Sequence, residues 1–301
     1  TSRLSSRSIL RIYTLSLIAS EFCNSIEELM DFFKNTFYGF LYNIESVERL
    51  IYEAVELLEN YDFIKERNDK LEATLIGKRV SELYIDPESA YLMTNSFKEL
   101  NNAKDISYTH VVNQCTEARP LLNVKNSEYE EINSEMTKFD DNLFSNEDEE
   151  LNLSAFKTSM VFNEWMNEIT DEMIMERYGV RPGELRTRLE IADWLLYSYG
   201  ELARLLEYNN IKIDVDKLRI RMSYGIKEEL LNLIRLKGIG RVRSRMLFNK
   251  GIKNVNDVKN TDVRIISEIV GKNVALDIKR QVGEKSEDNK VNERLVGYGI
   301  K

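Results

Sequence analysis

Cysteine and histidine are nearly absent from this sequence. Its 301 residues include two cysteines, Cys23 and Cys115, and one histidine, His110. Two cysteines far apart in the chain build neither a disulfide framework nor a metal site. One histidine leaves little room for zinc binding or histidine-based catalysis. The sequence therefore predicts no metal ligands and no catalytic residues of its own.

Proline and glycine are also scarce, with 3 and 13 residues. Long stretches place apolar residues at the helical spacing of three and four, which predicts an almost entirely α-helical protein. No apolar run approaches the roughly 18 residues that a membrane span needs, and no signal peptide is visible. We therefore expect no membrane contact and a cytoplasmic location.

The motifs of nucleotide hydrolysis are missing as well. The chain contains no Gly-x-x-x-x-Gly-Lys-Ser/Thr phosphate loop and no Asp-Glu-x-His or Asp-Glu-Ala-Asp box. ATP hydrolysis needs these groups to cradle the phosphates and to hold magnesium. These residues alone are therefore not expected to hydrolyse ATP.

The acidic net charge hides a basic C-terminal part. The whole chain has a formal net charge of −9. Residues 1–85 carry −4, residues 86–210 carry −14, and residues 211–301 carry +9, with 21 Lys and Arg against 12 Asp and Glu. Because local fields matter more than their sum, the C-terminal part is the candidate for binding nucleic acid.

A helix, a tight glycine-containing hairpin and a second helix are predicted in residues 233–251, LIRLKGIGRVRSRMLFNKG. Ile239 is expected in the core, while the flanking glycines let backbone N–H groups face outward where the second helix begins and an anion is favoured. Seven basic residues and no carboxylate lie between Arg235 and Lys253. The pattern indicates a helix-hairpin-helix that binds nucleic-acid phosphates, and the alternative is a glycine-rich connection with a solvated basic face. The candidate contacts are Lys237, Gly238, Gly240, Arg241, Arg243 and Arg245.

Three helices and a β-hairpin are predicted in residues 1–85, an order typical of a winged helix. The helices are expected near residues 8–20, after a Ser25–Glu28 capping box, and at 44–60, with the hairpin at 63–73. A winged helix usually presents its third helix to the DNA major groove. Here that helix is acidic, so we interpret this domain as a packing module; its charged residues are Glu45, Glu48, Arg49, Glu53, Glu56 and Glu59.

Residues 86–210 are predicted to form a helical domain. Helices are expected at about 87–100, 104–118, 126–138, 154–168 and 171–178. The run of carboxylates in residues 140–150 is sequential and lacks ordered spacing, so an exposed loop is favoured over a metal or acid–base site. Residues 211–301 are assigned to the helix-hairpin-helix domain, with a helix at 214–224, a weaker second hairpin at 269–273, a helix at 274–282 and a polar tail.

A long helix at about 182–208 contains Trp194. Its predicted apolar stripe consists of Leu185, Leu189, Ala192, Leu196, Tyr199, Ala203 and Leu206. Trp194 lies about 200° around the axis from Leu196, at 100° per residue. A tryptophan among polar neighbours either packs beneath another helix or offers a stacking surface to a base. Periodicity alone favours packing.

Several blocks in order resemble the C-terminal half of archaeal Hjm-type DNA helicases. These are superfamily 2 enzymes related to the helicase part of DNA polymerase theta. The resemblance spans essentially the whole chain, in the order winged helix, helical ratchet domain and helix-hairpin-helix. The matching blocks are LSLIAS at 15–20, VSELYIDP at 80–87, WMNE at 165–168, ERYG at 176–179, PGELR at 182–186, ADW at 192–194 and IGRVR at 239–243.

This resemblance changes the interpretation of Trp194. In these helicases the long ratchet helix lines the channel for single-stranded DNA, and a tryptophan at the matching position stacks on a base. An arginine two turns earlier usually assists. Thr187 occupies that position here, so the role is transferred to its neighbour Arg186, and Arg204 joins the set as a helical neighbour of Trp194. Arg243-Ser-Arg245 stands where the family has an Arg-Ala-Arg element that binds the strand.

The resemblance implies the strand-guiding C-terminal part of an ATP-dependent helicase with 3′–5′ polarity. Such an enzyme acts on single-stranded and forked or branched DNA in repair and replication restart. The resemblance also implies two RecA-like motor domains, which bind ATP and Mg²⁺, before Thr1, and the start without methionine suggests a piece of a longer protein or a trimmed chain. A prokaryotic, DNA-associated monomer is expected. The alternatives are a stand-alone DNA-binding adaptor and the matching part of a related RNA helicase.

Overall fold

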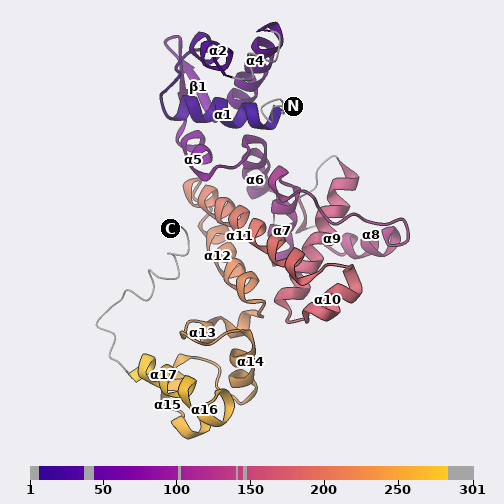
Figure 1. Cartoon of the computed structure of the whole chain (residues 1–301), viewed down its shortest axis with the longest axis vertical. Coiled ribbons are helices and arrows are strands. Elements are labelled where there is room, and N and C mark those ends of the chain that lie inside the picture. The colour runs from indigo at the N-terminus through magenta and orange to yellow at the C-terminus, as the bar shows by residue number, and fades with distance from the viewer. Residues whose placement is uncertain (1–6, 37–43, 101–102, 140–141, 145–147, 284–301) are drawn as a thin grey trace. The chain divides into compact units, whose positions relative to one another are not determined.

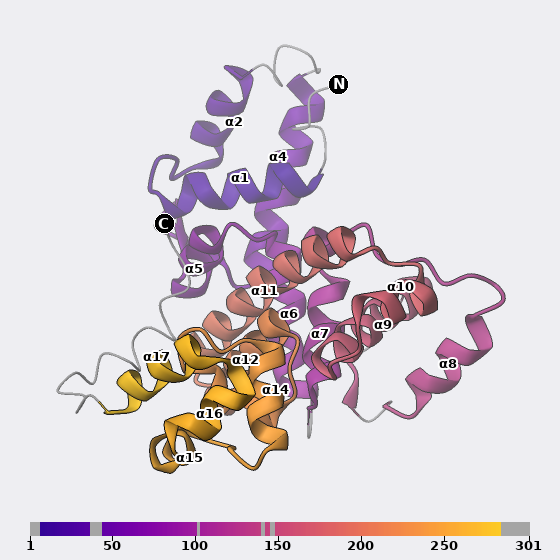
Figure 2. The same ribbon diagram turned by 60° about the horizontal axis from the view of Figure 1, so that its bottom comes forward.

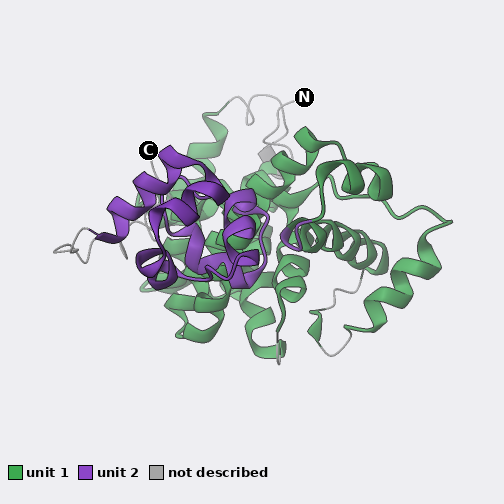
Figure 3. Cartoon of the chain, turned by 90° about the horizontal axis from the view of Figure 1, so that it is seen from below, with its two compact units in different colours: residues 1–165, 169–223 green, residues 166–168, 224–301 purple. Residues whose placement is uncertain are grey.

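The computed structural model divides into two compact units (Figure 3). It describes residues 7–36, 44–100, 103–139, 142–144 and 148–283. Unit 1 comprises residues 1–165 and 169–223, and unit 2 comprises residues 166–168 and 224–301. The described residues are mainly helical, as the scarcity of proline and glycine predicted (Figure 1).

Unit 1 begins with helices packed around a two-stranded hairpin. The elements are α1 (Arg7–Ala19), α2 (Ile26–Lys34), α4 (Ile44–Asn60), β1 (Ile64–Arg67), β2 (Lys70–Ala73) and α5 (Leu75–Leu83). Helix α1 lies against α4, α5 and β2, and its buried residues include Leu10, Leu15 and Ile18. The antiparallel strands pair Arg67 with Lys70 across the predicted Asn68–Asp69 turn, where both residues have positive φ. This order fits a winged helix, which stays a prediction.

Helix α5 was not predicted, and its close approach to the hairpin depends on Gly77. A Cβ atom on Gly77 would lie 1.9 Å from the carbonyl oxygen of Phe63. Thr74 caps the helix: its side chain accepts from the Gly77 N–H at 3.1 Å and its hydroxyl donates to the Asp62 carbonyl at 2.8 Å. The helix therefore sits directly on the start of the hairpin.

The rest of unit 1 is a helical bundle built around α11. Its elements are α6 (Pro87–Glu99), α7 (Asp105–Gln114), the 3-10 turn η2 (Thr116–Ala118), α8 (Tyr129–Thr137), α9 (Glu149–Met166), α10 (Asp171–Tyr178), α11 (Pro182–Leu205) and α12 (Asn209–Tyr224). Helix α11 packs against α5, α6, α7 and η2 (Figures 1 and 2). Tyr199 on α11 is fully buried, and its hydroxyl lies 2.8 Å from the Ser96 hydroxyl on α6.

A buried carboxylate joins the N-terminal helices to this bundle. Asp86, 1% exposed, caps α6 as predicted and receives two hydrogen bonds from the Arg11 guanidinium, at 2.5 and 2.8 Å. The Asp86 N–H donates to Glu117 at 2.6 Å. Burial raises the pKa of Glu117 despite its hydrogen bonds with Ser89 and the Asp86 backbone. Asp86 thus ties α1, α6 and η2 together.

Several predicted boundaries shift in the structure. Helix α9 begins at residue 149 and not at 154, and α12 begins at 209 and not at 214. The predicted domain boundary at residue 210 therefore falls inside α12, while the compact unit extends to residue 223. The functional division into three domains stays a prediction. Parts of the expected acidic loop (140–141 and 145–147) and the polar tail from 284 lie outside the described residues.

Unit 2 consists of short helices. They are the 3-10 turn η4 (Glu228–Leu230), α13 (Leu231–Ile234), α14 (Arg241–Asn249), α15 (Val255–Asn260), α16 (Val263–Val270) and α17 (Lys272–Gly283). Helix α17 packs against α15 and α16, and α14 packs against α13 and α16. The buried residues of these helices include Leu233, Leu247, Val258, Ile266 and Ile278.

Candidate nucleic-acid interface

Trp194 lies on α11 and is neither fully buried nor free of contacts. The side chain is 37% exposed, and its indole N–H donates to the Leu83 carbonyl at 3.2 Å. The hydrogen bond fixes one edge of the ring against the end of α5. The packing alternative is therefore met in part, since the side chain is held at one edge and partly exposed, and stacking on a base stays a prediction.

The predicted apolar stripe of α11 is incomplete. Leu185, Ala192, Leu196, Tyr199 and Ala203 are buried as expected, whereas Leu206 is 36% exposed at the end of the helix. Leu195 and Leu202, outside the predicted stripe, are fully buried. A single stripe describes a helix that is covered on one side, but α11 is covered by α5, α6 and α7.

An ion-pair network lies on the polar side of α11. Glu201, only 9% exposed, accepts from Arg79 of α5 at 2.7 Å and from Arg204 at 3.1 Å. Burial alone would raise the pKa of Glu201, but the two guanidinium groups lower it below its usual range. Arg204 keeps a side-chain exposure of 55%. Part of its charge is therefore already balanced inside the protein.

Arg219 of α12 adds a second cation that periodicity did not reveal. It donates to Asp193 at 2.8 and 3.0 Å, and its guanidinium carbon lies 5.0 Å from the centre of the Tyr197 ring. Asp193 and Tyr197 flank Trp194 along α11. Arg79 was likewise overlooked, because helical spacing does not tell which helices are neighbours in space.

Arg186 is the exposed member of the two arginines beside Thr187. Its side chain is 83% exposed, with a 3.3 Å ion pair to Glu190, whereas Arg188 is 14% exposed and bound to Glu184 at 2.8 Å. Arg186 also lines a pocket at the start of α11, together with Trp165, Leu185, Leu189 and Met222. Its position suits a surface contact, and its role stays a prediction.

In unit 2 a tight glycine turn joins α13 to α14 at the predicted position, while its assignment as a helix-hairpin-helix stays a prediction. Gly238 has φ +87°, which a side chain would disfavour, and Ile239 is 3% exposed in the core. The Gln281 side chain on α17 holds the turn: it accepts from the Lys237 N–H at 2.8 Å and donates to the Lys237 carbonyl at 3.0 Å. The Lys237 side chain remains exposed.

Helix α14 begins at the hairpin and places its first-turn N–H groups there without intrahelical acceptors. Gly240 is its N-cap, and Arg241 is half-buried. Arg243 folds back so that its guanidinium donates to the Gly238 carbonyl at 2.8 Å, while the residue stays exposed. The backbone donors and these cations thus occupy one end of α14.

Arg245 is already bound to carboxylates. It donates to Glu168 at 2.6 and 2.7 Å and to Glu229 at 2.8 Å. The hydrogen bonds to Glu168 raise the pKa of Arg245 further, and they lower the pKa of Glu168 although its burial acts in the opposite direction. A phosphate contact at Arg245 would therefore have to replace these internal ion pairs.

An apolar surface adjoins the cations of α14. Val242 is 69% exposed and Met246 is 43% exposed. Both line a shallow pocket with Ile269 and Val270, the last two residues of α16. The second predicted hairpin at 269–273 is present as a turn through Gly271, with φ +88°, between α16 and α17.

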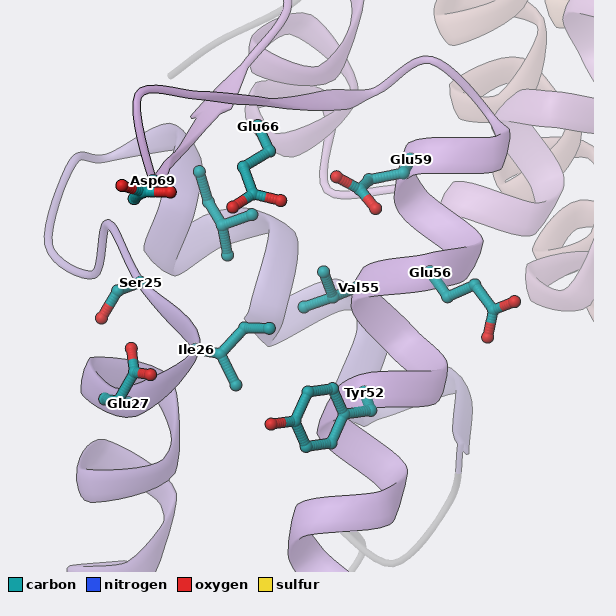
Figure 4. Close-up of a pocket in the computed structure, with 10 residues that line it drawn as sticks. Ser25, Ile26, Glu27, Tyr52, Val55, Glu56, Glu59, Glu66 and Asp69 are labelled. Atoms are coloured by element: carbon teal, nitrogen blue, oxygen red, sulfur yellow. The ribbon is translucent and has the colours of Figure 1, made fainter.

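The N-terminal part of unit 1 presents an acidic groove between α2, α4 and the β-hairpin (Figure 4). The apolar part of its lining includes Ile26, Val55 and Leu71. The carboxylates that line it are Glu27, Glu56, Glu59, Glu66 and Asp69. Such a surface repels phosphates, and the role of this domain as a packing module stays a prediction.

Within the described residues, no group of three or more His, Cys, Asp and Glu side chains could hold a metal ion. The same part of the chain contains no helix with the length and apolar character of a membrane span.

Comparison with known proteins identifies relatives along most of the chain. Residues 106–225 match the family described as archaeal helicase, domain 4. The chain is 38% identical to the ATP-dependent DNA helicase Hel308 of Methanococcus vannielii, over 91% of this chain and 42% of that protein. It is 36% identical to Hel308 of Methanocaldococcus jannaschii (97% and 24%) and 33% identical to that of Caldivirga maquilingensis (94% and 40%).

The chain thus spans less than half the length of these relatives. The matches confirm the resemblance to an archaeal DNA helicase that the ordered sequence blocks indicated. Accordingly, this chain belongs to the archaeal Hel308-type helicases and corresponds to a C-terminal segment of such a protein.

Proposed function

We propose that this chain is the DNA-binding, strand-guiding part of an ATP-dependent 3′–5′ DNA helicase that acts on forked or branched DNA. The observation that carries the proposal is Trp194 on the long helix α11, whose indole N–H is held by the Leu83 carbonyl and whose side chain is partly exposed. An aromatic ring that is held in place and partly exposed accepts any base, which suits an enzyme that moves along a strand.

The proposed roles divide along the chain. Motor domains in the parent protein bind ATP and Mg²⁺ and pull the strand. Helix α11, in the ratchet domain (86–210), holds the strand between steps through Trp194, with Arg186 and Arg204 nearby. The helix-hairpin-helix domain (211–301) grips the strand with the N–H groups at Gly238 and Gly240 and with Lys237, Arg241 and Arg243. The winged helix (1–85) serves as a packing module.

Binding to a panel of nucleic acids tests this function. We expect the chain to bind single-stranded and forked DNA more tightly than blunt duplex DNA, with an affinity that falls as salt rises. Matched RNA oligonucleotides address the RNA-helicase alternative, because stacking and phosphate contacts accept either polymer. The relatives are ATP-dependent DNA helicases by name, which favours DNA. Preference for blunt duplex over single strands would contradict a strand-guiding role.

The isolated chain is expected to show no DNA-stimulated ATPase activity. The groups that cradle phosphates and hold magnesium are absent from its sequence. Phosphate release should equal that of a buffer control, with and without single-stranded DNA. Turnover that co-purifies with the chain, at constant specific activity through successive columns, would contradict this expectation.

The arginines of α14 are expected to differ in their contribution to binding. Replacing Arg241 and Arg243 with Ala should flatten the log–log salt dependence for single strands by up to about 1.4 units, at roughly 0.7 per phosphate contact. Arg245→Ala should lower the melting temperature and leave the slope unchanged, because Arg245 neutralises Glu168 and Glu229.

The matched control is Arg264→Ala, which removes an exposed arginine from α16 of the same unit. If Arg264→Ala flattens the slope as much as the double variant does, the basic residues act as a diffuse solvated face. A hairpin site would then be wrong.

A further inference from the structure

Tyr84 is an exposed aromatic residue on a rigid piece of backbone. It follows α5 and is 79% exposed, whereas its neighbours Leu83 and Ile85 are 6% and 2% exposed. Its backbone adopts the left-handed conformation, with φ 57° and ψ 27°, and its N–H donates to the Ser81 carbonyl. The buried flanks therefore hold the main chain in place and present the ring to solvent.

Neither the exposed ring of Tyr84 nor its left-handed backbone conformation stabilises the folded chain. The left-handed conformation is disfavoured for residues with a Cβ atom, and glycine or asparagine normally occupies this position after a helix. A ring that remains 79% exposed gains little from burial. A large aromatic side chain in a conformation that suits glycine indicates a role outside folding.

Trp194 lies directly beside this residue. Its indole nitrogen is 3.2 Å from the Leu83 carbonyl oxygen, which belongs to the peptide unit that joins Leu83 to Tyr84. In a trans peptide that oxygen is about 2.8 Å from the next Cα atom. The indole nitrogen of Trp194 therefore lies within about 6 Å of the Tyr84 Cα atom, by these two distances.

This proximity brings both residues within reach of one short stretch of a strand, because a strand advances about 3.4 Å per nucleotide and a tyrosine ring extends several ångströms beyond its Cα atom. The carboxylates close to this surface are already paired: Glu82 with Arg79 at 2.8 Å, and Glu201 with Arg79 and Arg204. A phosphate passing here therefore meets neutralised side chains.

We propose that Tyr84 and Trp194 form a two-ring site that holds neighbouring bases of the single strand. Trp194 supplies one stacking surface from α11, and Tyr84 supplies a second from the end of α5. The inference rests on the proposed function, because it places Tyr84 on the same strand path as Trp194. Both rings accept any base, so the site adds affinity without sequence preference.

Tyr84 variants separate stacking from folding. Tyr84→Gly and Tyr84→Asn both remove the ring and both suit the left-handed backbone, and the asparagine adds no glycine flexibility. We expect either change to raise the Kd for a single-stranded oligonucleotide about five- to fifty-fold, with an unchanged salt slope. The melting temperature should stay the same or rise. Tyr84→Phe should bind like the unmodified chain.

The matched control is Tyr52→Ala, which removes an exposed tyrosine beside the acidic groove and should leave the Kd unchanged. Trp194→Ala is measured in parallel. If Trp194→Ala weakens binding and both ring-removing Tyr84 variants do not, the two-ring site is wrong and the proposed function stands. If neither position matters, the proposed strand path fails as well. If Tyr84→Phe binds the oligonucleotide as weakly as Tyr84→Gly does, the hydroxyl group and not the ring makes the contact, and the stacking proposal is wrong.

Discussion

Replacing Trp194 with Ala is expected to weaken single-strand binding by about 1–3 kcal/mol, because a base loses its stacking partner. The salt dependence should stay nearly constant, since no phosphate contact is removed. The free energy of unfolding should fall by less than the roughly 3–5 kcal/mol of a core tryptophan, because 37% of this side chain is already exposed. Titrations at several salt concentrations and a denaturant melt on the same variant measure both quantities.

Trp194→Phe is the matched variant for this prediction. It keeps an aromatic ring but loses the N–H group that donates to the Leu83 carbonyl. We expect it to retain much of the affinity for single strands and to lose stability modestly. If Trp194→Ala instead melts much earlier and, once folded, binds DNA normally, Trp194 is a packing residue and the strand does not pass over α11.

The protein is expected to lose about 3 kcal/mol of stability through His110 as the pH falls from neutral to 4. His110 is fully buried on α7, with Nε2 3.2 Å from the Asn152 carbonyl and Nδ1 3.1 Å from the Gln114 amide nitrogen. In this arrangement Nε2–H donates and Nδ1 accepts. A second proton on Nδ1 would point at the Gln114 amide group, which is itself a donor. The same amide nitrogen also donates to the Phe144 carbonyl at 2.9 Å, so it is held in this orientation.

Burial lowers the pKa of His110 to about 4, from its ordinary value of 6.5. As the pH falls, the His110 imidazole is therefore protonated near pH 6.5 in the unfolded chain, whereas in the folded chain it stays neutral until about pH 4. The full contribution to stability is present above pH 6.5, it declines as the pH falls through this window, and it is gone below pH 4. A shift of this size corresponds to about 3 kcal/mol, at 1.36 kcal/mol per pKa unit.

Urea melts between pH 7.5 and 4 on the unmodified chain and on His110→Gln isolate this contribution. Carboxylates titrate in both proteins, so the difference in unfolding free energy between them carries the histidine effect. We expect that difference to shrink as the pH falls. A difference that stays constant across the window would show that His110 titrates alike in the folded and unfolded chains.

Local backbone rules predicted several parts of this structure well. The capping box at Ser25, the Asn68–Asp69 turn and the helix start at Pro87 each depend on the conformational preference of one or two residues. The burial of Ile239 between Gly238 and Gly240 followed from the same reasoning. These features need no knowledge of distant parts of the chain.

Contacts between distant helices could not be read from spacing. The buried circumference of α11 exceeds one stripe because three helices cover it, and its partner Arg79 lies more than a hundred residues away in sequence. The carboxylates around Arg245 include Glu168, which precedes it by 77 residues. The family resemblance located Trp194 as a stacking candidate, but it gave no sign of the carbonyl that fixes the indole ring.

The carbonyl of the peptide between Leu83 and Tyr84 accepts the hydrogen bond from the Trp194 indole. In the same segment, Asp86 accepts hydrogen bonds from Arg11 of α1 and caps α6. In mechanical terms, this short segment is a joint between the N-terminal helices and the bundle. A strand held by Trp194 and pulled along α11 would exert a torque on that joint. If the strand follows the proposed path, any rotation of the N-terminal helices about the joint would tilt the ring, and strand tension and the orientation of α1 would be coupled through this segment.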